Sequence, residues 1–336
     1  MRLTRRGYGV VAVAVAAFAL SLHAGPRSLN AVAGPALVTL AYGVVTLGRR
    51  DPPTVSRRKP APGFPGETRD IHLTVEGNGP VSIRDRTGSG LEPVGDNERY
   101  VTDGETSYEV ELVGRGEHAL GPTEVTQRDT LGVVSRETVV STTTPALVYP
   151  VVKPIAPNRT FQGLVERAGT ADRDAFDTLR EYVPGDALRD VHWTSSAKRE
   201  PGDLVVAEFA REDEGGLTLA VEGDTGYGDE MAAAAASIAV HLLAADLELA
   251  VHTPGGRVRK GRGEEHRDEI LELLARTPPG RVGDVEADVR VRANADGVHV
   301  TANSTTFPFT DLTDGVRAAA FDARADVAEQ ESEVTA

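Results

Sequence analysis

The sequence predicts three structural parts in order: two N-terminal transmembrane helices, an antiparallel β-sandwich domain and an α/β domain. Three observations lead to this prediction. Two uncharged apolar stretches lie within the first 50 residues, a run of short segments then alternates apolar with polar residues, and short apolar segments later alternate with helical ones. Alternation with a period of two indicates half-buried strands, whereas apolar residues spaced three and four apart indicate helices.

Residues 1–50 form the predicted transmembrane helix hairpin. The stretches 7–26 and 28–48 contain no Asp, Glu, Lys or Arg. Each has about 20 residues, which is enough for a helix to cross a hydrocarbon core of about 30 Å. Backbone groups in lipid must be hydrogen-bonded within the segment, so helices are the local solution. Only a short turn around Pro26 and Arg27 connects the two stretches.

The charges that flank these stretches predict the orientation. Arg27 alone lies between the stretches, whereas many basic residues lie outside them, namely Arg2, Arg5, Arg6, Arg49, Arg50, Arg57, Arg58 and Lys59. The positive-inside rule then predicts a multi-pass protein of the cell (plasma) membrane with both termini and the soluble body in the cytoplasm. The alternative is a cleaved signal peptide, whose outline MRLTRRG and the following apolar stretch share.

Residues 51–68, rich in proline and basic residues, are predicted to be a linker near the membrane surface. The β-sandwich is predicted over residues 69–149. Its strand signals are the segments IHLTVEG, PVSIRDR, SYEVELVGRG, TEVTQRD and ETVVSTTT, which Gly, Pro, Asp and Asn separate.

The α/β domain is predicted over residues 213–310. Strand signals in GGLTLAVEGD, LELAVHTPGG, VRVRAN and GVHVTAN alternate with helix signals in DEMAAAAASIAVHLLAADL and EEHRDEILELLART. Such alternation is typical of parallel strands joined by helices. The segment GRGEEHRDE is predicted to be a turn that leads into the second helix, and residues 311–336 an acidic, frayed C-terminal tail.

The composition excludes several classes of function. The 51 acidic and 36 basic residues give a net charge of −15, which argues against nucleic acid as a partner. The absence of cysteine excludes disulfides, thiolate metal sites and a cysteine nucleophile. Basic charge comes almost wholly from arginine, a bias typical of haloarchaeal proteins, although a GC-rich genome encoding an acidic protein would give it too.

The sequence predicts no catalytic residue and no cofactor. Residue types of a hydrolase triad occur together at Asp186, Asp190, His192, Ser195 and Ser196. However, no Gly-x-Ser-x-Gly elbow is present, and adjacent side chains on a strand or turn point apart. Three further histidines lack the spacing of metal ligands and are predicted to be surface or helix-flanking residues, namely His241, His252 and His266.

Residues 150–212 are predicted to form a separate signature region, and the most informative stretch of the chain, residues 176–213, reads FDTLREYVPGDALRDVHWTSSAKREPGDLVVAEFARED. It resembles the signature of the DUF58 family, and RGEHALGPTEVTQRDTLGVVSRE upstream is similar to the strand pair that closes that family's sandwich domain. The signature side chains are predicted to lock a turn against a strand or to form a partner-binding surface. The matching positions are Arg180, Tyr182, Pro184, Gly185, Asp186, Arg189, Trp193, Ser196, Ala197 and Lys198.

The resemblance implies that the α/β region is similar to a von Willebrand factor A domain. Such domains bind a divalent metal through Asp-x-Ser-x-Ser after the first strand, and hard oxygen ligands suit Mg²⁺. Here the segment reads Glu222-Gly223-Asp224-Thr225-Gly226, so both serines and the first aspartate are replaced. The expectation is no intact metal site, with Glu222 and Asp224 as the remaining oxygen ligands.

These features predict a non-enzymatic membrane-anchored scaffold or adaptor that binds protein partners. The resemblance implies a MoxR-type AAA ATPase and other A-domain membrane proteins as partners, in chaperone or assembly work. One alternative is a divalent-metal-dependent protein-binding module that uses Glu222 and Asp224. Another is an envelope enzyme facing outward, which requires the opposite orientation in the membrane.

Overall fold

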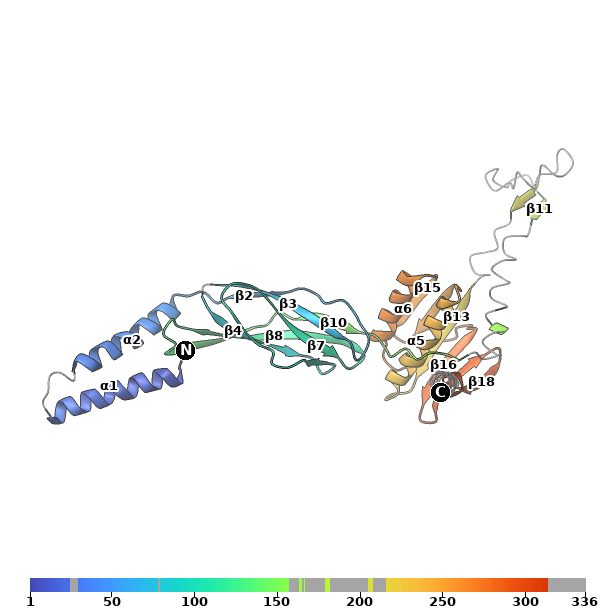
Figure 1. The fold of residues 1–336 in the computed structure, drawn as a ribbon. Coiled ribbons are helices and arrows are strands. Elements are labelled where there is room, and N and C mark those ends of the chain that lie inside the picture. Colours follow the sequence, from blue (N-terminus) through green and yellow to red (C-terminus); the bar gives the residue numbers. More distant parts are fainter. Residues whose placement is uncertain are drawn as a thin grey trace, which may run out of the picture. The chain divides into compact units, whose positions relative to one another are not determined.

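A computed structural model describes residues 1–24, 30–77, 79–156, 163–164, 166, 179–181, 205–207 and 216–313. The chain divides into two compact units, Met1–Val148 and Tyr149–Ala336. Figure 1 shows the first unit in blue to green and the second in yellow to red. The chain is rich in antiparallel sheets and has apolar helix at its N-terminus.

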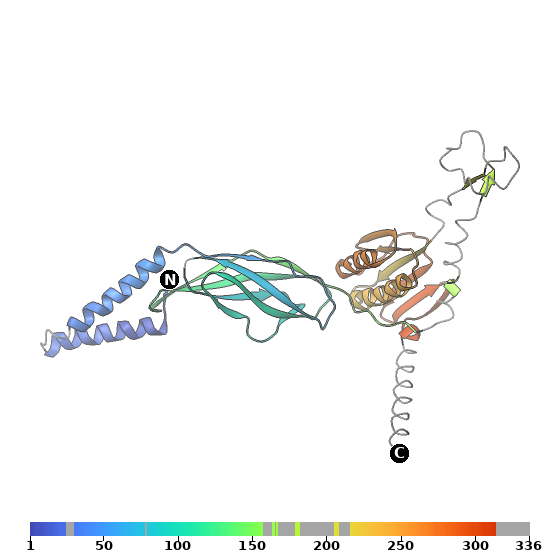
Figure 2. The same ribbon diagram turned by 45° about the horizontal axis from the view of Figure 1, so that its top comes forward.

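The first unit begins with a helix hairpin formed by α1 (Arg5–Ala24) and α2 (Asn30–Gly48). The two helices lie side by side in both ribbon views (Figures 1 and 2). Among the described residues, the stretch Ala31–Gly48 is the one that is long and apolar enough to cross a membrane. Many apolar side chains on both helices are exposed, among them Val13, Val15, Phe18, Leu20, Leu37, Val38 and Val44.

Two antiparallel sheets, together called the sheet pair here, make up the rest of the first unit. One sheet has the order β1-β9-β8-β4-β6, and β10 also pairs with β8; the other has the order β2-β3-β7-β5. The five segments predicted as strands fall in β3, β4, β7, β8 and β9. The bounds are β1 Arg2–Leu3, β2 Thr54–Arg57, β3 Thr68–Glu76, β4 Val81–Thr87, β5 Leu91–Pro93, β6 Glu98–Val101, β7 Gly104–Leu112, β8 Gly116–Arg128, β9 Val134–Val140 and β10 Thr144–Val148.

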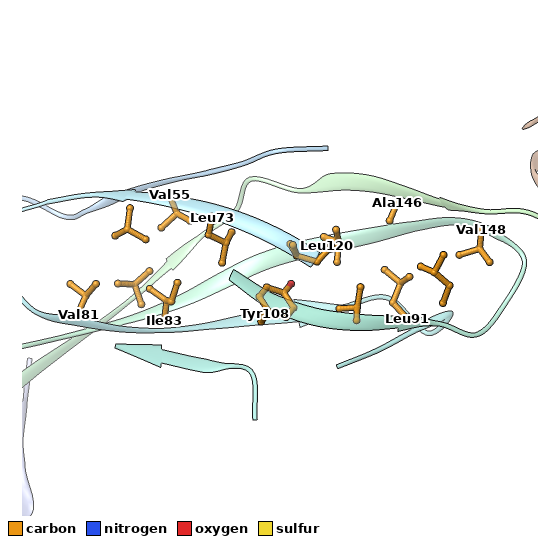
Figure 3. Packing of buried hydrophobic residues seen from close by; sticks show 14 residues of the cluster. Val55, Leu73, Val81, Ile83, Leu91, Tyr108, Leu120, Ala146 and Val148 are labelled. Atoms are coloured by element: carbon orange, nitrogen blue, oxygen red, sulfur yellow. The ribbon is translucent and has the colours of Figure 1, made fainter. Parts of the chain in front are cut away.

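Both sheets contribute side chains to one apolar core. Figure 3 shows these side chains between the strands, including Ile83 from one sheet and Leu73 from the other. Because apolar side chains alternate with polar ones along each strand, one face of each sheet is removed from water, and this burial is the main stabilising contribution. The members of the core are Val55, Ile71, Leu73, Val75, Val81, Ile83, Leu91, Tyr108, Val110, Leu112, Leu120, Val125, Ala146 and Val148.

The segment 51–68 differs from the predicted linker because it contains strand β2. Thr54–Arg57 pairs antiparallel with β3, and Val55 belongs to the core. The Arg57 side chain is 2% exposed and forms a bidentate ion pair with Asp85 on β4, with Nη2–Oδ1 and Nε–Oδ2 distances of 2.6 and 3.0 Å. A basic residue that the sequence places beside the membrane therefore lies inside the protein.

Asp85 is the centre of a buried polar network that joins the two sheets. The Tyr108 hydroxyl donates to its Oδ2 at 2.6 Å, and the Thr123 hydroxyl donates to its Oδ1 at 2.7 Å. Burial raises the pKa of Tyr108, and the hydrogen bond to Asp85 and the charge of that carboxylate raise it further. In the described part of the chain, no buried side-chain nitrogen or oxygen lacks a partner.

The second unit contains a mixed sheet with the order β15-β14-β13-β16-β17-β18. Strand β13 runs parallel to both of its neighbours, β14 and β16, and the other pairings are antiparallel. Helices α5 and α6 pack against each other, and α5 packs on the sheet. The bounds are β13 Leu217–Gly223, α5 Gly228–Ala244, β14 Leu249–Thr253, β15 Gly256–Gly261, α6 Glu264–Arg276, β16 Val289–Asn294, β17 Gly297–Ala302 and β18 Thr305–Pro308.

Three details of this unit differ from the sequence prediction. Strands β15 and β18 add antiparallel edges that the alternating pattern did not predict, and Gly261 ends a strand rather than lying in a turn. Within the predicted tail, Leu312 is fully buried and its carbonyl accepts a hydrogen bond from the Ala156 N–H at 2.7 Å. Residues 314–336 lie outside the described residues.

Candidate functional site

The carboxyl end of β13 is the candidate ligand site of the second unit. In open α/β sheets, ligands bind beside the carboxyl ends of parallel strands where the strand order reverses. Strand β13 has β14 on one side and β16 on the other, so its end is such a point. Glu222 and Asp224, the oxygen ligands that remain of the degenerate metal motif, lie there.

The charge of Glu222 is matched by two arginines of β16. Its side chain is 8% exposed, its Oε1 lies 2.8 Å from Arg290 Nη1, and its Oε2 lies 3.7 Å from Arg292 Nη2. Asp224 is exposed, and its N–H donates to the Ala293 carbonyl at 2.8 Å. The described residues contain no group of three or more His, Asp or Glu side chains arranged for a metal ion.

A loop of the same unit also crosses the end of β13. The Gly223 N–H donates to the Gly280 carbonyl at 2.9 Å, so the connection from α6 to β16 passes beside the strand end. A Cβ atom at Gly223 would lie 2.8 Å from the Met231 sulfur, which shows how closely α5 approaches. Protein groups therefore occupy the region in which ligands bind in other α/β folds.

The three histidines predicted to be surface or helix-flanking residues differ in exposure. His266, in the first turn of α6, is buried beside β15, and its Nε2 lies 2.7 Å from the carbonyl oxygen of Leu249 on β14. His241 and His252 are half-buried. Burial lowers the pKa of His241, since the charged imidazolium loses hydration. Each of the three lies on a different element, α6, α5 and β14.

The DUF58-like signature lies almost wholly outside the described residues. Arg180 is on the short strand β11 (Leu179–Glu181), which pairs antiparallel with β12 (Val205–Ala207) and places Arg180 opposite Val206. The residues outside the description are Tyr182, Pro184, Gly185, Asp186, Arg189, Trp193, Ser196, Ala197 and Lys198.

A second candidate region is the junction between the helix hairpin and the sheet pair. Leu47, at the end of α2, is fully buried against Val133 and Val134 of the loop and strand after β8. Leu3, Val10 and Leu40 pack on the same cluster from the N-terminal side and from both helices. The two helices are therefore packed onto the sheet pair at their base.

Hydrogen bonds fix the start of α1 at this junction. Strand β1 adds Arg2 and Leu3 to the edge of β9, and the next residue, Thr4, donates its N–H to Val133 at 3.0 Å and its hydroxyl to Gly132 at 2.5 Å. A Cβ atom at Gly7 would lie 2.1 Å from the Val133 carbonyl oxygen, so only glycine fits there. The β8–β9 turn appears in the quoted upstream segment, but the sequence carried no signal for its contact with the helices.

The outer face of the sheet pair has a pocket of about 360 Å³ with acidic walls. Three glutamates line it, Glu98, Glu124 and Glu137. A hydrogen bond from Ser82 and the positive charge of Arg84 hold the pKa of Glu98 below its usual value. Each glutamate pairs with an arginine, Glu98 with Arg84, Glu124 with Arg86 and Glu137 with Arg2, so the pocket adds little net charge to this face.

The comparisons with known proteins assign no family. No family model and no curated protein matches the chain. Parts of the chain are similar to three solved structures. The PKD domain of an M14-like peptidase from Thermoplasmatales archaeon SCGC AB-540-F20 is 15% identical, covering 27% of this chain and 93% of that one, with a TM-score of 0.18.

The other two structures are an adhesion complex and an adhesin. The CsuC–CsuE chaperone-tip adhesion subunit pre-assembly complex of Acinetobacter baumannii is 11% identical, covering 40% of this chain and 73% of that one, with a TM-score of 0.21. The SrpA adhesin of Streptococcus sanguinis is 14% identical, covering 40% and 82%, with a TM-score of 0.21. Similarity at this level carries no information about the function of this chain.

Proposed function

We propose that this chain is a non-enzymatic membrane-anchored scaffold, held by two transmembrane helices, that presents its soluble units to protein partners in the cytoplasm. One observation carries the anchoring: a hairpin with exposed apolar side chains has its base packed and hydrogen-bonded onto the sheet pair. Exposed apolar surface of this extent is energetically unfavourable in water and favourable in contact with lipid. In this proposal the sheet pair is a β-sandwich held at the membrane surface.

Two features support the second span and the orientation. Strand β1 precedes α1 and strand β2 follows α2, so the outer ends of both helices join the same body. Residues 5–6 and 49–50 are all arginines, which favours the cytoplasmic side. Cleavage of a signal peptide would remove β1 and Thr4 and expose Leu47, so the junction argues against that alternative.

The anchoring is tested by alkaline extraction of membranes and by protease protection in sealed vesicles. The full chain should stay with the membrane at high pH, and protease added outside inverted vesicles should digest both soluble units. Release at high pH would contradict the anchor, and protection of the soluble units would reverse the orientation.

Substitution of two glycines of α1, Gly7 and Gly9, tests whether the junction stabilises the packing of the hairpin on the sheet pair. Gly7→Ala should destabilise the junction by about 1–3 kcal/mol, because the added methyl group meets the Val133 carbonyl. Gly9→Ala is the matched control, since a Cβ atom there meets nothing within 4 Å. Hydrogen exchange of the β8–β9 turn in the detergent-solubilised full chain measures the effect, and equal exchange in both variants would contradict this role.

The scaffold part of the proposal rests on the DUF58 resemblance, which implies a MoxR-type AAA ATPase as partner. The von Willebrand A-like reading of the second unit rests on it too, supported by the parallel strands β14, β13 and β16. Pull-down of the ATPase with the full chain, unaffected by a chelator, is the expected result. Failure to recover any such ATPase from membranes that contain both proteins would contradict the partner assignment.

A further inference from the structure

A polar pocket of about 520 Å³ lies where α1 begins, beside strands β8 and β9. Three arginines line it: Arg5 and Arg6 from the first turn of α1, and Arg128 from the end of β8. Thr4 and Ser135 add hydroxyl groups, and Glu137 is the one acidic residue in its wall. All of these residues belong to the first unit.

Among the described residues, no carboxylate pairs with the three arginines of this pocket. In the described part of the chain, the side chains of Arg5, Arg6 and Arg128 form no ion pair or hydrogen bond. The carboxylate of Glu137 pairs with Arg2 at 3.1 Å. The nearby Asp129 carboxylate is buried and accepts the N–H groups of Val134 and Leu131 at 2.7 and 3.0 Å. Unmatched arginines are unexpected in a chain with a net charge of −15.

Further arginines at the same junction have neutral partners. Arg50 donates to the Arg128 carbonyl at 3.1 Å and lies 3.4 Å from the Thr130 hydroxyl. Arg136 donates to the side chain of Gln127 and to the Arg50 carbonyl. These bonds fix both guanidinium groups without cancelling their charge, so the region offers several positive groups to an anion.

The position of the pocket indicates the kind of anion, an inference that rests on the proposed membrane anchoring. The uncharged stretch of α1 begins at Gly7, directly after the pocket arginines, so the pocket lies at the depth of lipid headgroups. Tyr8, two residues after Arg6, is exposed, and tyrosine side chains favour the interface between water and lipid. Guanidinium groups bind phosphate with charge-assisted hydrogen bonds.

We propose that this pocket binds the phosphate group of an anionic phospholipid. The three arginines hold the phosphate oxygens, and the hydroxyl group of Ser135 faces the polar part of the headgroup. The acyl chains lie along the exposed apolar side of the hairpin. The lipid thereby joins α1 to β8, and the chain recognises a membrane of negative surface charge.

The test is native mass spectrometry of the full chain in neutral detergent, titrated with phosphatidylglycerol, with phosphatidylcholine of the same acyl chains, and with inorganic phosphate. The variant is Arg5→Gln with Arg6→Gln and Arg128→Gln. The matched control is Arg257→Gln with Arg259→Gln and Arg281→Gln, which changes the charge equally on exposed arginines of the second unit. Since one arginine contributes roughly fivefold to binding at an anionic surface, the variant should lose on the order of 100-fold in affinity for phosphatidylglycerol.

Tighter binding of phosphatidylglycerol than of phosphatidylcholine, lost in the variant and kept in the control, supports the proposal. Equal binding of both lipids, or unchanged binding in the variant, overturns it. Inorganic phosphate that binds as tightly as phosphatidylglycerol overturns the lipid as ligand and leaves a free-phosphate site. The pocket and the anchor are tested separately, because alkaline extraction reports on the helices and the titration in detergent reports on the arginines.

Discussion

The two units each bury a carboxylate against arginine, but they do so to different degrees. Asp85 in the first unit is 0% exposed, and its partner Arg57 is 2% exposed. Glu222 in the second unit is 8% exposed, but its partners Arg290 and Arg292 are 34% and 48% exposed. Water screens the ion pair of Glu222 but not that of Asp85. The Asp85 pair therefore contributes more to stability, since it joins the two sheets of the first unit, whereas the Glu222 pair only joins two neighbouring strands.

The largest effect is expected from removing Arg57. Arg57→Ala leaves the Asp85 carboxylate buried without its counter-charge, which should lower the opening free energy of β2 and β4 by about 3–5 kcal/mol. Hydrogen exchange of peptides from these strands in the full chain measures the change. Arg58→Ala, which changes the exposed neighbouring arginine, is the control. A loss below about 1 kcal/mol would show that the pair contributes no more than a surface pair.

The next effect is expected at Tyr108. Tyr108→Phe removes a hydrogen bond to a charged acceptor and should cost about 1.5–3 kcal/mol. Tyr100→Phe is the control because Tyr100 is 72% exposed. Equal stability of the two variants would contradict a role for the hydroxyl in the network.

Tyr108 also predicts a pH dependence. Its pKa is raised in the folded state above the ordinary value of 10.0, so it stays neutral while the unfolded chain ionises. The contribution of Tyr108 to the free energy of unfolding should therefore be constant below pH 10 and should fall above it, by at most about 1.4 kcal/mol per pH unit. The same alkaline titration of Tyr108→Phe should have a shallower slope, and identical slopes would show that Tyr108 is not the group responsible.

A smaller effect is expected at Glu222. A double-mutant cycle of Glu222→Gln and Arg290→Gln should give a coupling energy of about 1 kcal/mol, because Arg290 is partly hydrated. Hydrogen exchange of β13 and β16 provides the measurement. A coupling energy as large as that of Asp85 with Arg57 would remove the difference between the two units.

The smallest expected effect is that of added metal. Since two guanidinium groups already match the charge of Glu222, calorimetry with millimolar Mg²⁺ or Mn²⁺ should detect no binding to the full chain. Heat that disappears in Glu222→Gln would instead support the metal-dependent binding module.

The sequence predicted most of the local structure and little of the long-range pairing. Periodicity predicted β16 and both helices of the second unit closely, because it depends only on neighbouring residues. Periodicity did not predict that Arg57 is buried, because its partner Asp85 lies on another strand. It also did not predict that Arg290 faces Glu222. The prediction of antiparallel strands is confirmed, whereas the expectation of no intact metal site and most of the DUF58-like signature remain predictions.

The pairing of β1 with β9 constrains how the protein is made. Thr4 binds Gly132, a residue 128 positions later in the sequence. The ribosome therefore synthesises both helices long before the β8–β9 turn, against which the base of the hairpin packs. If the hairpin is anchored in the membrane as proposed, its insertion into the bilayer should precede completion of the sheets, and delayed insertion would leave apolar helices open to aggregation.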